Sequence, residues 1–362
     1  MKILFTGGGT GGHIFPIIAV ARAMKDNAAT ADAEMLFVGP CRGMKDEFSR
    51  VGVRAHHLVT GKIRRYPSLR TLVDIPLLAV GFLQAYWYLL WNMPDVVFSK
   101  GGYGAFPVVV VAWMFRIPIV AHESDSIAGA TNRLLARFAR VIITSFSGEH
   151  PELPAEKIVR LGNPVRDMRP RRGVKPSGTT KPTILVLGGS QGATQINELL
   201  FQSLASLTDR YRIVHQVGER HVRAADEAHI EMPARLRPFY EPRAFLNEEQ
   251  MREAYAQADL VISRAGSGAI FEIALVGKPS ILIPLLTSAG GHQQQNAILY
   301  ERAGACLRLD APLIKPMELM RAIEEVMESG ARRGKMARAA RSFSRPNAAR
   351  DIANTIIEYA QQ

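Results

Sequence analysis

The chain has 362 residues, a length at which two domains of roughly 150 residues each are expected. Hydrophobic residues make up 47% and charged residues 22%, as in an ordinary folded protein, and the only two cysteines, Cys41 and Cys306, exclude a disulfide framework and a zinc motif. The net charge of +12 predicts an acidic partner, but the absence of a basic tail or of interleaved aromatic and basic residues argues against nucleic acid.

Short apolar runs alternate with helix-length segments along the chain, a pattern typical of βαβ units and parallel sheets. In the first half, strands are predicted at Ile3–Thr6, Met35–Val38, Arg54–Val59, Val96–Ser99, Pro118–Ala121 and Val141–Thr144. In the second half they are predicted at Thr183–Leu187, Arg212–Val217, Leu260–Ser263, Ser280–Pro284 and Ala305–Leu309. The N-terminus begins with a strand and carries no signal-peptide pattern, so a cytoplasmic location is expected.

A stretch rich in Gly, Pro, Arg and Lys separates the two halves and predicts an interdomain linker. We therefore expect a first domain at 1–162, a linker at 163–181, a second domain at 182–344 and a terminal helix at 345–362. Both halves open with a strand and a glycine-rich turn, ILFTGGGTGG and ILVLGGSQGA, which predicts two Rossmann-like domains with a cleft between them. In the terminal segment, apolar residues at helical spacing predict packing against a sheet.

The first glycine turn, FTGGGTGGHIFP, superficially satisfies the dinucleotide fingerprint through Gly7, Gly9 and Gly12. That fingerprint needs an acidic residue at the end of the second strand. Asp32 and Glu34 precede that strand and would lie at its wrong end, so a nicotinamide cofactor is not expected. The turn can still bind a phosphate through backbone N–H groups and the helix dipole.

The second half carries residues suited to a sugar nucleotide. The turn at 188–192 has the composition of a diphosphate cradle with Ser190 as a hydroxyl donor, although such a turn can also serve packing alone. Glu272 could accept hydrogen bonds from ribose hydroxyls, or simply interact with a helix dipole. The run GHQQQNA, with Gln293, Gln294 and Asn296, offers planar amides that both donate to and accept from sugar hydroxyls.

Seven motifs, in order and spanning nearly the whole chain, resemble glycosyltransferase family 28, the peptidoglycan enzymes that add N-acetylglucosamine to lipid I to form lipid II. They are GGTGGHIFP (8–16), SKGGYGAFP (99–107), HESDSIAGATNR (122–133), GNPVR (162–166), GGSQGA (188–193), SRAG with its following Glu (263–272) and HQQQNA (292–297).

The resemblance implies a GT-B fold, in which two Rossmann-like domains with parallel sheets face each other across a cleft and a C-terminal helix returns to the N-terminal domain. It implies UDP-GlcNAc as donor, undecaprenyl-linked lipid I as acceptor, and a peripheral location at the cytoplasmic face of the inner (plasma) membrane, with other cell-wall synthesis proteins as further partners. The implied donor-binding residues are Thr10, Gly11, Gly12, Arg166, Ser190, Gln191, Gly192, Phe245, Leu246, Ser267, Glu272, Gln293 and Gln294.

Two departures from the family pattern stand out. The commoner His-Glu-Gln-Asn is here His122-Glu123-Ser124-Asp125, so that a carboxylate replaces an amide. The segment 267–269 lacks the usual Ala-hydrophobic-Thr, so a threonine side-chain contact is lost there.

For the chemistry we expect an inverting displacement by the acceptor hydroxyl at the anomeric carbon. His13, with an ordinary pKa near 6.5, is the first candidate base, Asp125 and Glu123 are rivals, and a merely loop-capping histidine is the alternative. No D-x-D motif demands a metal, no other cofactor is required, and assistance by a divalent ion stays open. The acceptor diphosphate is expected on the first glycine turn and its neighbour, at Gly8, Gly9, Thr10, Gly101, Gly102 and Tyr103.

Residues 75–93 form the most hydrophobic run of the chain, just long enough to span a bilayer. Because a span there would separate strands of one sheet, we predict a partly exposed crossover helix. The basic fringe of Lys62, Arg64, Arg65 and Arg70 favours attachment to an anionic membrane surface, the alternative being a buried helix beside a solvated loop. A diacylglycerol glycosyltransferase, a UDP-GlcNAc 2-epimerase and a non-catalytic lipid-carrier binding subunit are the competing functions.

Overall fold

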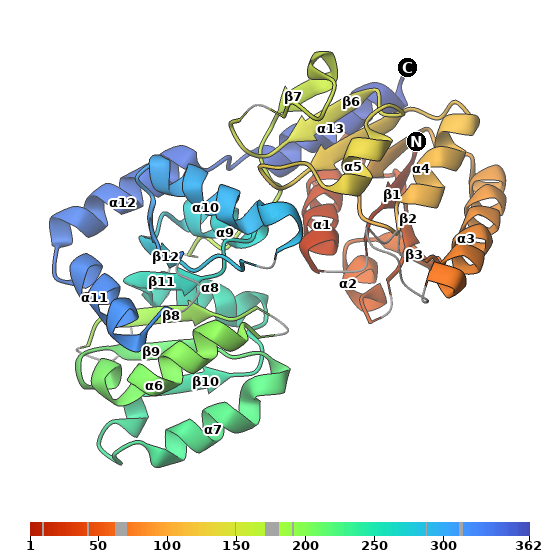
Figure 1. Ribbon diagram of the computed structural model, residues 1–362. Helices are drawn as coiled ribbons and strands as arrows, with labels where there is room; N and C mark the ends of the chain where they lie inside the picture. Colours follow the sequence, from red (N-terminus) through yellow and green to blue (C-terminus); the bar gives the residue numbers. More distant parts are fainter. Residues whose placement is uncertain are drawn as a thin grey trace. The chain divides into compact units, whose positions relative to one another are not determined.

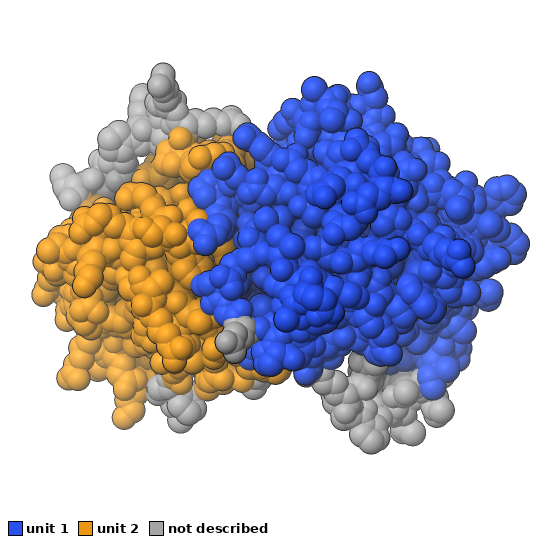
Figure 2. Space-filling model, turned by 90° about the horizontal axis from the view of Figure 1, so that it is seen from above, with its two compact units in different colours: residues 1–166, 345–362 blue, residues 167–344 orange. Residues whose placement is uncertain are grey.

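The computed structural model describes residues 1–8, 11–41, 43–61, 71–148, 150–170, 181–189, 192–286, 288–310 and 314–362. The chain divides into two units: residues 1–166 with 345–362, and residues 167–344, coloured blue and orange in Figure 2. The division falls after Arg166, a few residues into the predicted linker, and residues 171–180 of that linker lie outside the described residues.

The first unit is built on a seven-stranded sheet whose described strand pairs are all parallel (Figure 1). In the order β3-β2-β1-β4-β5-β6-β7, its strands are β3 (Val53–His57), β2 (Glu34–Gly39), β1 (Lys2–Thr6), β4 (Val96–Ser99), β5 (Ile119–Glu123), β6 (Val141–Thr144) and β7 (Ile158–Arg160). Its helices are α1 (Gly11–Lys25), α2 (Lys45–Arg50), α3 (Thr71–Asn92), α4 (Phe106–Met114), α5 (Ala130–Leu135) and α13 (Ala348–Ala360), with a 3-10 turn at Ala155–Lys157.

Alternation along β1 explains why helices cover both faces of this sheet. Ile3 and Phe5 join a core with α1, α2 and α13, whereas Leu4 joins a second core with α3, α4 and α5. Because successive side chains of a strand point to opposite faces, a strand buried on both sides is apolar throughout. The terminal helix α13 packs against α1 and β4, so the predicted docking of this helix on the N-terminal unit is confirmed.

The second unit repeats the design with a six-stranded sheet whose described pairs are again parallel. Its order is β10 (Tyr240–Arg243), β9 (Arg212–Gln216), β8 (Thr183–Leu187), β11 (Leu260–Ser263), β12 (Ser280–Leu282) and β13 (Cys306–Arg308). Its helices are α6 (Thr194–Arg210), α7 (Val222–Glu231), α8 (Glu248–Gln257), α9 (Ser267–Val276), α10 (His292–Arg302), α11 (Pro316–Met327) and α12 (Gly330–Phe343), with 3-10 turns at Glu219–His221, Arg237–Phe239 and Ala289–Gly291. The prediction of two Rossmann-like parallel sheets is thereby confirmed.

All eleven predicted strands exist, but several of their ends were predicted wrongly. The strand predicted to reach Val59 ends at His57, because the Val59 N–H donates to the Gln84 side chain of α3 instead of a neighbouring strand. The strand predicted at Pro118–Ala121 runs on to Glu123, where its last residues pair with β6. This extension places His122 and Glu123 at the carboxyl end of β5.

Two edge strands, β7 and β10, were not predicted. Their sequences are IVR and YEPR, too short or too polar to show an apolar run. Pro242 lies within β10, which is compatible with an edge position because proline cannot donate to a second neighbour.

Helix α3 lies between β3 and β4 in the chain and packs against α4, as predicted for a crossover helix. Part of its surface is exposed, including Leu83, Trp87 and Trp91. Among the described residues, none of the helices has the length and apolar character needed to cross a bilayer. The basic fringe at Lys62, Arg64, Arg65 and Arg70 lies outside the described residues.

Candidate functional site

The candidate site of the first unit begins where β1 and β4 diverge. The chain runs from β1 to β2 on one side and from β4 to β5 on the other, so the strand order reverses between β1 and β4. In open parallel sheets, ligands bind at the carboxyl ends of the two strands where the order reverses. The Gly8 N–H donates to the Gly101 carbonyl at 2.9 Å, and the Lys100 N–H donates to the Thr6 carbonyl at 2.8 Å. The structure thus brings Gly8 together with Gly101 and Gly102, while Gly9 and Thr10 lie outside the described residues.

His13 lies in the first turn of α1, with its imidazole against the two glycine turns. A Cβ at Gly8 would lie 3.2 Å from its Nδ1, and one at Gly102 would lie 3.2 Å from its Nε2. Burial, followed by the positive charge of Lys100, lowers the pKa of His13 from 6.5 to about 4, against a smaller opposing effect of Asp125. The ring is therefore neutral at pH 7 and able to accept a proton.

Lys100 is a site residue that sequence reasoning missed, although it lies inside the motif SKGGYGAFP. Only 2% of it is exposed. Its Nζ lies 2.6 Å from His122 Nδ1 and donates to Ser124 Oγ. Burial lowers the pKa of Lys100 to about 8, while the charges of Glu123 and Asp125 act in the opposite direction.

Glu123 is buried and accepts three hydrogen bonds. The Asp125 N–H donates to Oε1 at 3.0 Å, and Gly129 N–H and Asn132 Nδ2 donate to Oε2 at 2.9 and 2.8 Å. Burial and the neighbouring charge of Asp125 raise the pKa of Glu123, with the hydrogen bonds opposing this rise. Glu123 therefore ties the end of β5 to the following loop and to α5.

The turn at Gly101 depends on a missing side chain. Gly101 has φ of +75°, and a Cβ there would lie 2.0 Å from Oδ1 of Asn132, the residue that binds Glu123. We expect Gly101→Ala to lower the free energy of unfolding by about 2 kcal/mol or more, measured by urea denaturation. Gly148→Ala is the matched control, because a Cβ at Gly148 meets no atom within 4 Å. Equal stability of the two variants would contradict this account.

In the second unit the glycine turn after β8 abuts the end of β9. The Gly188 N–H donates to the Gln216 carbonyl at 2.9 Å, and Gly192, with φ of +81°, allows no Cβ because His221 Nδ1 would lie 2.3 Å away. His221 Nε2 lies 3.1 Å from Thr194 Oγ1 at the start of α6, a neighbour of the turn that the sequence did not reveal. Ser190 and Gln191 lie outside the described residues.

The starts of α9 and α10 also lie at the carboxyl edge of the second sheet. Ser267 opens α9, and Glu272 lies in the second turn of that helix rather than the first, which weakens the interpretation of Glu272 as a helix-dipole charge. Gln293 and Gln294 lie in the first turn of α10. Gln293 Oε1 accepts from the Leu285 N–H at 2.9 Å, so this side chain also holds the preceding loop.

Asn296 was predicted to bind sugar hydroxyls, but its side chain lies inside the second unit. It is fully buried, and its Nδ2 donates to the Ala265 carbonyl at 3.2 Å, which ties α10 to the turn before α9. Leu246, predicted near the uracil, donates its N–H to Gln216 Oε1 at 3.2 Å, whereas the neighbouring Phe245 side chain is exposed.

Four of the predicted donor-binding residues belong to the first unit, and one of them, Thr10, lies outside the described residues. Gly11 and Gly12 open α1, and the Arg166 guanidinium lies 4.7 Å from the centre of the Phe15 ring on the same helix. Arg166 is thereby placed beside the helix that starts at the first glycine turn. Across the described ranges, no three His, Cys, Asp or Glu side chains gather closely enough to hold a metal ion.

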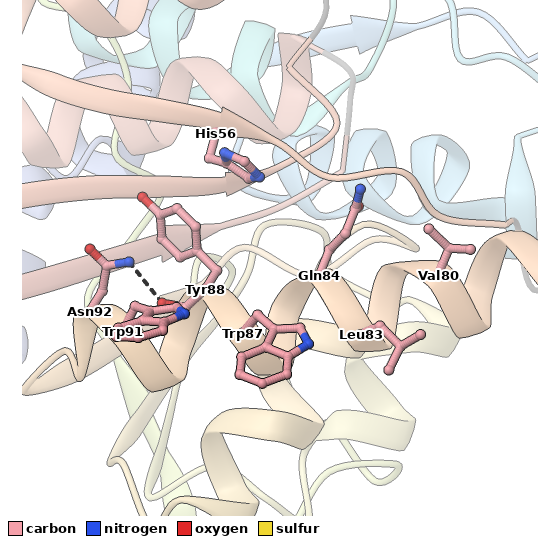
Figure 3. A pocket seen from close by; sticks show the side chains of 8 residues that line it. All are labelled: His56, Val80, Leu83, Gln84, Trp87, Tyr88, Trp91 and Asn92. Atoms are coloured by element: carbon pink, nitrogen blue, oxygen red, sulfur yellow. Dashed lines mark hydrogen bonds between the residues drawn. The ribbon is translucent and has the colours of Figure 1, made fainter.

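A separate feature of the first unit is an open groove of about 490 Å³ beside α3. Figure 3 shows Val80, Leu83, Trp87 and Trp91 along the helix, and His56 of β3 across from Tyr88. The His56 and Tyr88 rings are 4.8 Å apart. With 79% of Trp91 and 54% of Trp87 exposed, this face is an uncovered apolar surface of the kind that marks an interaction site.

Comparison with known proteins links both units to one family. Residues 3–144 match the glycosyltransferase family 28 N-terminal domain, and residues 183–356 match the family 28 C-terminal domain. A protein of Anaeromyxobacter sp. (strain K), named UDP-N-acetylglucosamine–N-acetylmuramyl-(pentapeptide) pyrophosphoryl-undecaprenol N-acetylglucosamine transferase, is 36% identical over 368 residues, covering 100% of this chain and 94% of its own.

Solved structures share the fold. The crystal structure of Acinetobacter baumannii MurG has a TM-score of 0.76 at 27% identity and covers 99% of both chains. The UDP-GlcNAc 2-epimerase of Neisseria meningitidis, bound to UDP-GlcNAc, has a TM-score of 0.66 at 16% identity, with 99% of this chain and 100% of that one covered, which shows the fold alone. These likenesses confirm the predicted GT-B fold class.

Proposed function

The chain belongs to glycosyltransferase family 28, and on this premise we propose that it transfers GlcNAc from UDP-GlcNAc to the MurNAc 4-hydroxyl of undecaprenyl-diphosphate-MurNAc-pentapeptide, converting lipid I to lipid II. The observation that carries the proposal is the chemistry at the carboxyl edges of the two sheets. At the first edge, a neutral histidine lies against two adjoining glycine turns. At the second edge, a glycine turn follows β8, while Glu272 lies in the second turn of α9 and Gln293 and Gln294 in the first turn of α10.

In the proposed reaction, the MurNAc oxygen forms a bond to the anomeric carbon of GlcNAc as the bond from that carbon to the UDP oxygen breaks. His13 takes the hydroxyl proton. Backbone N–H groups at 188–192 and the start of α6 stabilise the charge that develops on UDP. Glu272 binds the ribose, and Gln293 and Gln294 bind the sugar.

The first glycine turn and its neighbour at 101–103 bind the acceptor diphosphate in this proposal. Asp125 orients the acceptor hydroxyl or competes with His13 for its proton. Glu123 has a structural role in this proposal and does not take the proton. Both of its carboxylate oxygens already accept hydrogen bonds, from the backbone N–H groups of Asp125 and Gly129 and from Asn132 Nδ2. Arg166, which lies against Phe15 of α1, remains a donor-binding residue in this proposal and adds positive charge near the nucleotide.

We place the enzyme peripherally at the cytoplasmic face of the membrane, with the exposed face of α3 against anionic lipid. Trp87→Glu and Trp91→Glu are each expected to lower vesicle binding about tenfold, because an apolar contact is replaced by a charge repelled by the lipid. Sedimentation with phosphatidylglycerol vesicles measures this. Ile230→Glu on α7 is the control, since Ile230 is also exposed but lies in the other unit. Unchanged binding of both tryptophan variants would move the membrane contact elsewhere.

The decisive experiment is UDP release from UDP-GlcNAc with a lipid I analogue, with diacylglycerol, and without acceptor. Release that requires the lipid I analogue supports the proposal. Release with diacylglycerol alone would indicate the other lipid glycosyltransferase, formation of UDP-ManNAc without acceptor would indicate an epimerase, and no turnover with any acceptor would indicate a non-catalytic binding protein.

A further inference from the structure

We propose that Lys100 is a positioning residue of the transfer reaction: through His122 and Ser124 it fixes the turn at 122–125 and so sets where the Asp125 carboxylate lies relative to His13. This inference rests on the proposed function. Because only 2% of Lys100 is exposed, it acts through other residues and not by touching the substrate.

The hydrogen bonds around Lys100 have a single consistent direction. His122 Nε2 lies 3.1 Å from the Gly162 carbonyl, which can only accept, so this nitrogen carries the proton. The other ring nitrogen, Nδ1, is then an acceptor for Lys100 Nζ at 2.6 Å. The lysine thereby connects the end of β4 with the end of β5 and, through His122, with Gly162, which immediately precedes the predicted linker.

The second acceptor of Lys100 extends the same network. Lys100 donates to Ser124 Oγ, and Ser124 donates onward to Asn163 Oδ1 at 3.4 Å. Asn163 is buried, and its Nδ2 has no hydrogen-bond partner among the described residues. Ser124 stands where the family more often has glutamine, and its short side chain brings an oxygen within reach of the lysine.

The charge of Asp125 acts on the same cluster. Asp125 also departs from the family pattern, as a carboxylate in place of an amide, and its charge acts on both Lys100 and His13. Lys100 from the turn after β4 and Asp125 from the turn after β5 are the charged groups that act on His13 among the described residues. A buried cation is tolerated where carboxylates compensate for it. Lys100 and Asp125 therefore operate together: the lysine holds the 122–125 turn, which carries the added carboxylate, through its bonds to His122 and Ser124.

Lys100→Met tests this. We expect kcat to fall about 10- to 100-fold, because small displacements of reacting groups cost this much, with the KM for UDP-GlcNAc within about twofold of wild type. The loss from Asp125→Asn should be smaller in the Lys100→Met background than in wild type, since the lysine acts through this carboxylate. Full independence of the two losses, or wild-type kcat in folded Lys100→Met, would overturn the proposal.

Two further measurements keep the test informative. Ser124→Ala keeps the lysine charge but removes one acceptor, and we expect about a 3- to 10-fold loss of kcat with a normal melting temperature; an unaffected kcat would count against the network. NMR titration of ¹⁵N-labelled histidines should show the pKa of His13 rising in Lys100→Met. An unmoved pKa of His13 would refute the electrostatic effect of Lys100 on His13. Because this measurement does not depend on sugar transfer, the role of Lys100 and the proposed transferase function can fail separately.

Lys278→Met is the matched control for loss of a buried lysine. Lys278 Nζ donates to the carbonyls of Ala256 and Ala258 in the second unit, remote in sequence from the 122–125 turn. It should lower the melting temperature without moving the pKa of His13. A shift of that pKa in the control would mean that the readout reports general destabilisation, and would overturn the assignment.

Discussion

His13→Ala is expected to lower kcat by about 10²- to 10⁴-fold, the range typical of losing a general base. The imidazole lies against both glycine turns, and its lowered pKa of about 4 keeps it neutral across the physiological range. The rate of the wild-type enzyme should therefore stay level as the pH falls through 6.5, with the acidic decline of kcat/KM for the acceptor near pH 4. Steady-state assays from pH 4 to 8 check both statements.

The same pKa gives a stability readout that separates chemistry from folding. The folded state binds this proton only below about pH 4, whereas the unfolded chain binds it below 6.5, so His13 destabilises the fold progressively as the pH falls from 6.5 to 4. His13→Ala removes this effect and should make the protein relatively more stable at pH 5. His229→Ala on α7 is the control. Near-normal turnover of His13→Ala would transfer the role of base to Asp125.

Elements with a strong apolar pattern could be predicted from the sequence, and weakly patterned ones could not. The central strands β1, β4, β8 and β11 are buried on both faces and read as unbroken apolar runs. Edge strands such as β10 carry charges and a proline, because one side of the ladder needs no partner. Their signal is indistinguishable from that of a loop.

The candidate site shows the same division. His13 could be singled out because it follows a glycine turn along the chain. Lys100 could not, because it becomes a buried partner of His122 and Ser124 only once β4 and β5 lie side by side. Glu123 and Asp125 look equivalent in the sequence. The structure separates them, since the backbone and Asn132 occupy the oxygens of Glu123.

Glu272→Gln is expected to raise the KM for UDP-GlcNAc about 10- to 100-fold, because hydrogen bonds from hydroxyls to a charged acceptor each contribute roughly 1.5–3 kcal/mol. Glu272 lies in the second turn of α9, past the first turn in which the helix dipole acts most strongly. The acceptor KM should not change. Isothermal titration calorimetry with UDP measures the loss of affinity for the nucleotide directly.

A deoxyribose donor makes this prediction specific to the ribose. If Glu272 accepts a hydrogen bond from a ribose hydroxyl, the wild-type enzyme should discriminate against UDP-GlcNAc that lacks the 2′- or 3′-hydroxyl of its ribose. Glu272→Gln should lose most of that discrimination, because the hydrogen-bond acceptor for the hydroxyl is already weakened in this variant. Glu249→Gln, on the exposed start of α8 in the same unit, controls for a change of net charge. Equal discrimination by wild type and Glu272→Gln would place the ribose elsewhere and leave Glu272 a structural role within α9.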